Sequence, residues 1–135
     1  MILADTSAWV EYLRATGSPV HRRMRQLITE DAGVVTTDVV VMELLAGTTK
    51  DEELTELRRL LLRFEHLPID PLDDFETAAD LYRQCRHSGE TVRALLDCLV
   101  AAVSLRTGAA VLYQDRDFDA IARQTPLQIA TPDTS

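Results

Sequence analysis

The chain has 135 residues, of which 46% are hydrophobic and 5% aromatic, and its formal net charge at pH 7 is -8. A chain of this length can bury a core without disulfides, so we expect a single domain over residues 1–135 whose last few residues are frayed. Modules that bind nucleic acid passively are normally basic, and the acidic balance argues against that class. It permits an enzyme in which bound metal ions cancel part of the negative charge.

The cysteines and the lengths of the apolar segments indicate the cellular compartment. Cys85 and Cys98 lie in apolar helical patterns without a second cysteine or a histidine at metal-ligand spacing, which indicates buried thiols in a reducing compartment. Met1 leads directly into a strand, without the basic segment of a signal peptide. The apolar stretches are too short, or too interrupted by charge, to span a membrane. We therefore expect a cytoplasmic protein with no membrane partner.

Short apolar or β-branched runs alternate with helical patterns along the chain. Strand candidates lie at residues 2–4, 34–37, 66–69, 109–113 and 127–129. Pro68 places the third candidate at a sheet edge, because proline donates no hydrogen bond to a central ladder.

Helix start and stop signals divide the remaining residues. Helices are expected after the cap at 5–7, from 18–19, from 37–38 to about Gly47, from Asp51, from 73–74 to Cys85, from beyond 88–89 to 107–108, and around 118–123. Strands separated by helices imply parallel crossovers. The fold class is therefore α/β, with helices on both faces of the sheet.

Four acidic residues stand at informative places. Asp5 and Asp115 follow apolar runs, where open α/β sheets place their sites, whereas Glu43 and Asp97 interrupt segments that otherwise read as buried helix. A carboxylate inside an apolar segment is costly to bury without a partner. If the fold brings the four together, their mutual repulsion demands a cation, and hard divalent metals such as Mg²⁺ or Mn²⁺ suit an all-oxygen site.

Each acid also has a structural interpretation when it is taken alone. Asp5 can cap a helix, Glu43 can lie on a solvated helix edge, and Asp97 can be satisfied by a neighbouring arginine. Asp115 and Asp117 can serve as caps of the helix that follows them. Four such residues at strand ends and inside apolar helices are, taken jointly, much harder to assign to chance.

These segments resemble the PIN domain, and more closely the VapC-type toxins of bacterial toxin–antitoxin pairs. The shared pattern is a strand followed by Asp-Thr-Ser at 2–7, an apolar-Glu-Leu helix at 40–44, Asp followed by small and apolar residues at 96–102, and Asp-x-Asp-Phe at 115–118. The resemblance covers essentially the whole chain. Gln114 departs from it, because the family commonly has a hydroxyl residue there.

The resemblance implies a three-layer α/β/α sandwich with a small parallel sheet of four to five strands. It implies an endoribonuclease that depends on Mg²⁺, for which Mn²⁺ can substitute. We assign metal binding and catalysis to Asp5, Glu43, Asp97 and Asp115, and a secondary metal-binding role to Asp117. As in the family, a homodimer and a small antitoxin protein are expected partners, and RNA is the expected substrate.

Several polar residues are candidates for contact with RNA. The hydroxyls of Thr6 and Ser7 can bind a carboxylate or a substrate phosphate, or cap a helix. Arginine pairs well with phosphate. The candidate arginines are Arg22 and Arg25 beside Arg23, and Arg86 within a group that includes Arg83, His87 and Arg93.

Two other classes remain open. A magnesium-dependent phosphotransfer domain also carries acids at the ends of parallel strands, but it needs a lysine after a late strand, and Lys50 is the only lysine. A non-catalytic acidic α/β binding module predicts instead that the acids are scattered over the surface.

Overall fold

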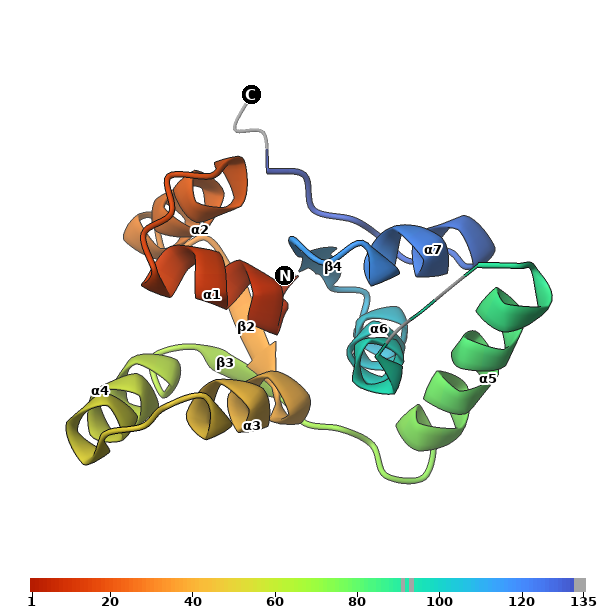
Figure 1. The fold of residues 1–135 in the computed structure, drawn as a ribbon, viewed down its shortest axis with the longest axis horizontal. Coiled ribbons are helices and arrows are strands. Elements are labelled where there is room, and N and C mark those ends of the chain that lie inside the picture. Colours follow the sequence, from red (N-terminus) through yellow and green to blue (C-terminus); the bar gives the residue numbers. More distant parts are fainter. Residues whose placement is uncertain (91, 93, 133–135) are drawn as a thin grey trace.

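The computed structural model describes residues 1–90, 92 and 94–132, and it places four strands and seven helices among them (Figure 1). The strands are β1 (Ile2–Ala4), β2 (Val34–Thr37), β3 (Glu65–Leu67) and β4 (Ala110–Leu112). The helices are α1 (Thr6–Leu13), α2 (Pro19–Thr29), α3 (Asp38–Ala46), α4 (Asp51–Leu61), α5 (Asp74–His87), α6 (Leu95–Thr107) and α7 (Asp117–Gln124).

All strand pairs in the sheet are parallel, and the strand order is β3-β2-β1-β4. In this register Leu3 lies opposite both Val35 and Val111. The run expected at 127–129 contributes one parallel bridge, between Ile129 and Val111, beside the free side of β4. The expected parallel sheet is therefore confirmed, with four strands and a single-bridge extension.

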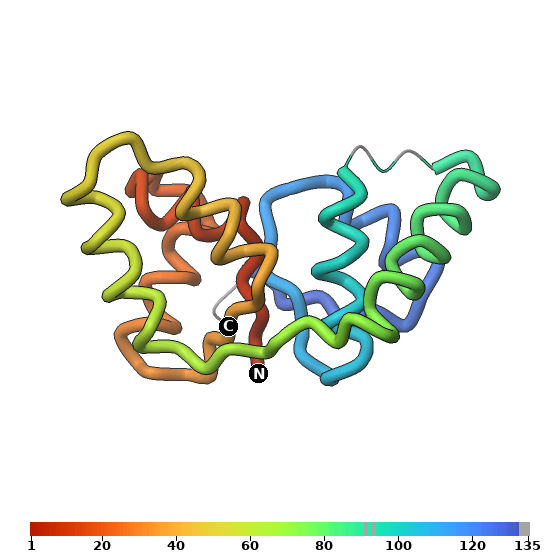
Figure 2. Tube along the Cα trace, turned by 90° about the horizontal axis from the view of Figure 1, so that it is seen from below, coloured from red at the N-terminus to blue at the C-terminus, as the bar shows by residue number. Residues whose placement is uncertain are grey.

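The helices form two layers on opposite faces of the sheet. Helices α1 to α4 lie on one side of the central strands, and α5 to α7 lie on the other (Figures 1 and 2). This arrangement follows from right-handed crossovers, because the chain moves outward from β1 to β3 and then returns past β1 to β4. The chain therefore reverses direction at β1, and a crevice opens at the carboxyl ends of β1 and β4.

The core is aliphatic, as the composition indicates. Helix α6 is buried along its length from Asp97 to Ser104, which explains why this segment reads as apolar on every side. Trp9 is fully buried and packs edge-to-face on Phe64 with ring centroids 5.4 Å apart. No helix in the described ranges has the length and apolar character that a membrane crossing requires.

An ion pair fixes α6 against α5. The guanidinium of Arg106 donates two hydrogen bonds from Nε and Nη2 to the buried carboxylate of Asp74, and Nη2 also donates to the carbonyl oxygen of Pro68 at 2.8 Å. A buried carboxylate needs such partners. The pair anchors the C-terminal half of α6, whose N-terminal turn carries Asp97.

Candidate active site

The acidic residues meet at the carboxyl end of the sheet. Asp5 follows β1 directly, and its backbone N–H donates to the carbonyl oxygen of Leu112 at 2.9 Å, which continues the ladder between β1 and β4. Asp115 follows β4 after two residues, and Asp117 begins α7. Asp97 lies in the first turn of α6. Neighbouring parallel strands thus bring residues from opposite ends of the chain to one edge.

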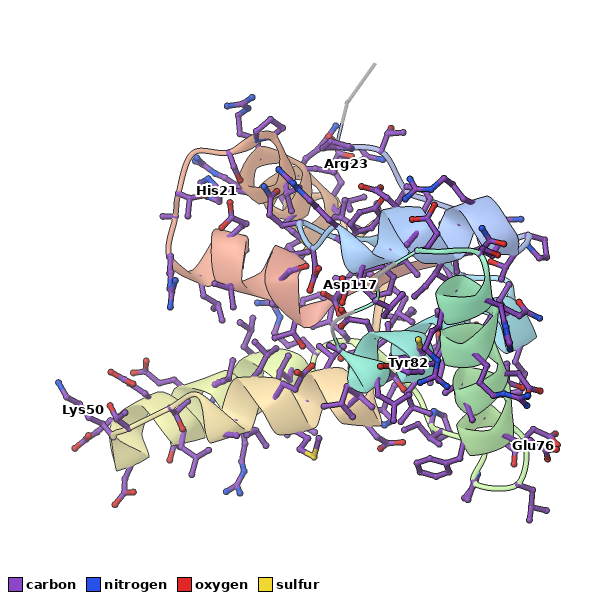
Figure 3. The ribbon with its side chains drawn as sticks, turned by 45° about the vertical axis from the view of Figure 1, so that its right-hand side comes forward. His21, Arg23, Lys50, Glu76, Tyr82 and Asp117 are labelled. Carbon is purple, nitrogen blue, oxygen red and sulfur yellow. The ribbon has the colours of Figure 1, made fainter. Side chains whose placement is uncertain are left out.

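Three carboxylates form the centre of the cluster. One oxygen each from Asp97, Asp115 and Asp117 lies within 4.8 Å of the others. Asp97 and Asp117 are buried and Asp115 is half-buried. Figure 3 shows Asp117 in the middle of the molecule, where α1 approaches α6 and α7. The three acids therefore face one another instead of pointing separately into solvent.

Asp5 and Glu43 extend this cluster. Burial raises the pKa of Asp97 to about 9, and the charges of Asp5 and Asp115 add to the effect. Burial also raises the pKa of Asp5, hydrogen bonds from Ser7 oppose the rise, and the charge of Glu43 adds to it. The shifted pKa values of Asp5 and Asp97 therefore link these two residues to the charges of Glu43 and Asp115.

Two hydroxyl side chains hold these carboxylates in place. Thr6 Oγ1 donates to Glu43 Oε1 at 2.7 Å. Ser7 Oγ donates to Asp5 Oδ2 at 2.7 Å and accepts from the backbone N–H groups of Gln114 and Asp115 at 2.9 and 3.2 Å. Ser7 therefore joins the end of β1 to the loop after β4. Of the alternatives that the sequence left open for both hydroxyls, the structure shows contact with a carboxylate.

Local capping and the acidic cluster coexist in the same residues. Asp5 caps α1, because its Oδ2 also accepts from the Ser7 backbone N–H at 3.0 Å. The Asp117 backbone N–H donates to Asp115 Oδ1 at 3.0 Å, and Asp117 Oδ2 accepts from the Ala94 backbone N–H at 3.0 Å. The capping interpretation is therefore confirmed for Asp5, whereas Asp117 bonds the residue before α6 instead of capping α7.

The acid cluster fits a hard divalent cation. Asp5 Oδ1 and Asp97 Oδ2 are buried and have no hydrogen-bond partner among the described residues. A buried carboxylate oxygen without a partner costs free energy, and a cation removes that cost while it screens the mutual repulsion. An all-carboxylate donor set is the kind that Mg²⁺ and Mn²⁺ prefer. The expected alternative for Asp97, an arginine partner, is not found in the described part of the chain.

A groove of about 880 Å³ runs past the cluster. Its lining residues come from α1, the segment after α5, the loop after β4, and α7, and they include Asp115 and Asp117. Sequence reasoning did not identify Arg116 and Arg123, which line this groove. The only available signal was that Arg116 lies between two site acids in the sequence.

The arginines singled out from the sequence lie elsewhere. Arg22 and Arg25 line a separate depression on α2. The Arg86 guanidinium lies over the Tyr82 ring at 5.5 Å from its centroid, in a small pocket that shares only Glu90 with the groove. Arg93 is outside the described residues. Contact of Arg22, Arg25, Arg86, Thr6 and Ser7 with RNA stays a prediction.

Comparison with known proteins identifies the family. The model of the PIN domain family matches residues 2–124. Ribonuclease VapC11 of Mycobacterium tuberculosis strain H37Rv is 47% identical over 132 residues, which cover 97% of this chain and 98% of that protein. The chain is a PIN-domain protein of the VapC ribonuclease family.

Solved structures agree with this VapC assignment. FitAcB from Neisseria gonorrhoeae is 25% identical with a TM-score of 0.74, and the match covers 98% of both chains. A toxin–antitoxin complex from Klebsiella pneumoniae is 18% identical with a TM-score of 0.72, again over 98% of both chains, and at this identity it shows the shared fold alone. The family and the α/β/α fold expected from the sequence are confirmed.

The bonds of Ser7 predict a strong dependence of metal affinity on its hydroxyl. Ser7→Ala removes three hydrogen bonds that orient Asp5 and the Asp115 loop. We expect Mn²⁺ affinity, measured by titration calorimetry, to fall by about 10–100-fold. Ser18→Ala is the matched control, since it removes the cap of α2 and costs about 1 kcal/mol of stability. Equal Mn²⁺ affinity in Ser7→Ala and wild type would contradict the assigned role.

The raised pKa of Asp97 predicts that stability falls with pH when metal is removed. The folded state holds the Asp97 proton more tightly than the unfolded chain does, so protonation of Asp97 stabilises the folded state at acidic pH. This contribution to the free energy of unfolding is lost as pH rises toward about 9. In EDTA, the free energy of unfolding in urea should fall by on the order of 1–3 kcal/mol from about pH 5 to about pH 8. Asp97→Asn should flatten this dependence, leaving a smaller slope from Asp5. Identical slopes in the two proteins would reject the coupling.

Proposed function

We propose that this VapC-family endoribonuclease hydrolyses RNA phosphodiesters with Mg²⁺, for which Mn²⁺ can substitute, bound by Asp5, Asp97 and Asp115 together with Glu43 and Asp117. One observation carries the proposal: three carboxylates, one from α6 and two from the start of α7 and the loop before it, converge within 4.8 Å, and buried oxygens of Asp5 and Asp97 lack a partner in the described ranges. Five neighbouring carboxylates repel one another when they are ionised, and a divalent cation offsets that repulsion.

The site offers separate residues to hold the cation, to accept a proton and to orient a carboxylate. When bound, the cation supplies Lewis acidity at the phosphoryl group and lowers the pKa of water. Asp97 and Asp115 offer buried and half-buried oxygens to hold it. Thr6 fixes Glu43 through Oε1, which leaves Oε2 of this half-buried side chain to accept a proton from the attacking water. Ser7 keeps Asp5 oriented toward the cluster.

The rival classes lack their required features. A phosphotransfer domain needs a lysine at the site, but the only lysine, Lys50, lies just ahead of α4, far from Asp117 in Figure 3. A non-catalytic binding module predicts scattered acids, whereas Asp97, Asp115 and Asp117 are gathered and two of them are buried. Membership of the VapC ribonucleases agrees with the nuclease alternative.

A cognate antitoxin and a homodimer belong to the same proposal, as does a cytoplasmic location. Support for the antitoxin comes from relatives of the same fold, including the toxin–antitoxin complex from Klebsiella pneumoniae and VapBC2 from Rickettsia felis bound to its promoter DNA. An arginine of such a protein would be attracted strongly to this cluster of negatively charged carboxylates.

Substitution of Asp97 tests the nuclease proposal. Asp97→Asn keeps the shape of the side chain but removes a buried ligand charge, so RNA cleavage with Mg²⁺ should fall by at least about 100-fold while the circular dichroism spectrum is unchanged. EDTA should stop cleavage by the wild type, and Mn²⁺ should restore it. Glu76→Gln is the control, because this exposed acid on α5 lies far from Asp117 (Figure 3). Cleavage that persists in Asp97→Asn or in EDTA would reject the mechanism.

Co-expression tests the partner. A small protein encoded beside this chain should copurify with it and suppress RNA cleavage, and sedimentation should give the mass of a homodimer for the chain alone. A neighbouring protein that neither binds nor relieves toxicity would remove the antitoxin from the proposal, and a monomer mass would remove the dimer.

A further inference from the structure

The groove beside the acids must accept a polyanion although its own walls are largely acidic. Four acidic residues line it: Glu11, Glu90, Asp115 and Asp117. A metal ion at the cluster offsets the charge only where it is bound. Phosphates of RNA on either side of the cleaved bond therefore need cationic side chains from the groove itself.

Among the residues that the structure describes, two arginines line the groove, and both come from the segment that carries Asp117. Arg116 is exposed and directly precedes α7, and its side chain makes no hydrogen bond or ion pair with the described residues. Arg123 lies seven residues further along, which is two turns and about 10 Å on the same side of the helix. At that separation the two guanidinium groups reach different phosphates of one strand.

Arg123 is held by a carboxylate in the geometry that it would offer to phosphate. Its Nε donates to Glu90 Oε1 at 2.8 Å, and its Nη2 donates to Glu90 Oε2 at 2.7 Å. This parallel pair of bonds is the fork by which arginine binds either a carboxylate or a phosphate. The side chain of Arg123 is 56% exposed and that of Glu90 28%, so solvent and ligand reach the pair.

We propose that Glu90 occupies the phosphate-binding guanidinium of Arg123 in the free protein, and that RNA binding exchanges this carboxylate for a backbone phosphate. The inference rests on the proposed function, since it takes RNA as the ligand of the groove. Glu90 then lowers affinity for RNA in two ways, because it repels phosphate and competes for Arg123. Glu11 lines the same groove but bonds Thr16 instead of an arginine, so it can only repel.

RNA affinity in matched variants tests the exchange. All variants carry Asp97→Asn so that RNA survives, and binding of a short mixed-sequence single-stranded RNA is measured with Mg²⁺ over a range of salt by fluorescence anisotropy. Glu90→Gln should tighten binding by about three- to ten-fold, and by more than Glu11→Gln, which removes the same charge from the same groove. Arg123→Gln should weaken binding and reduce the magnitude of the salt slope by about 0.7, the value for one lost phosphate contact on a single strand.

The double variant separates competition from simple repulsion. In the Arg123→Gln background, Glu90→Gln should tighten binding no more than Glu11→Gln does, because no guanidinium remains to be released. Arg58→Gln is the control for loss of a positive charge, as this exposed arginine lies on α4 and does not line the groove.

The outcomes distinguish this inference from the nuclease proposal. Equal effects of Glu90→Gln and Glu11→Gln, or a salt slope unchanged by Arg123→Gln, would overturn the exchange. If the otherwise unaltered protein still cleaves RNA with Mg²⁺ in that case, the nuclease proposal stands and only the role of Arg123 is lost. A wild type that neither cleaves nor binds RNA would overturn both.

Discussion

Carboxylates crowded into a poorly hydrated edge of the sheet are the constraint on which the rest of this structure depends. Asp5 and Asp97 are nearly inaccessible to water, and the charge of Asp5 raises the cost of ionising Asp97. Such an arrangement is unfavourable by itself, so the surrounding fold must stabilise it. Pairing of β1 with β4, burial of α6 from Asp97 to Ser104 and the ion pair of Arg106 with Asp74 hold the acids close together.

Much of the fold could be read from the sequence because its signals are local. The short apolar runs before Asp5 and Asp115 marked adjacent parallel strands, and Glu43 and Asp97 stood out because charge is rare inside apolar helices. The edge strand, expected at 66–69, begins one residue earlier and ends two residues earlier, at Glu65–Leu67, and Pro68 follows it because it has no N–H to donate. The run at 127–129 pairs only through Ile129.

The remaining features depend on contacts between distant segments. The sequence could not choose among a carboxylate, a phosphate and a helix cap for Ser7, because its partners include Gln114 and Asp115, over 100 residues away. Nor could it rank the arginines, since all of them are typical surface residues. Arg116 and Arg123 differ from Arg22 and Arg25 only in that the fold sets them beside the acids.

The position of β1 between β2 and β4 has a consequence for synthesis of the protein. Strand β1 can complete its contacts only after β4 has been made, because Ala4 pairs with Leu112 and Ser7 Oγ accepts from the loop that follows β4. Contacts of such long sequence separation form late. A nascent chain therefore lacks a complete acidic site until β4 and the start of α7 have been translated. Before that point, the RNA of the ribosome that makes this ribonuclease does not meet a finished active site.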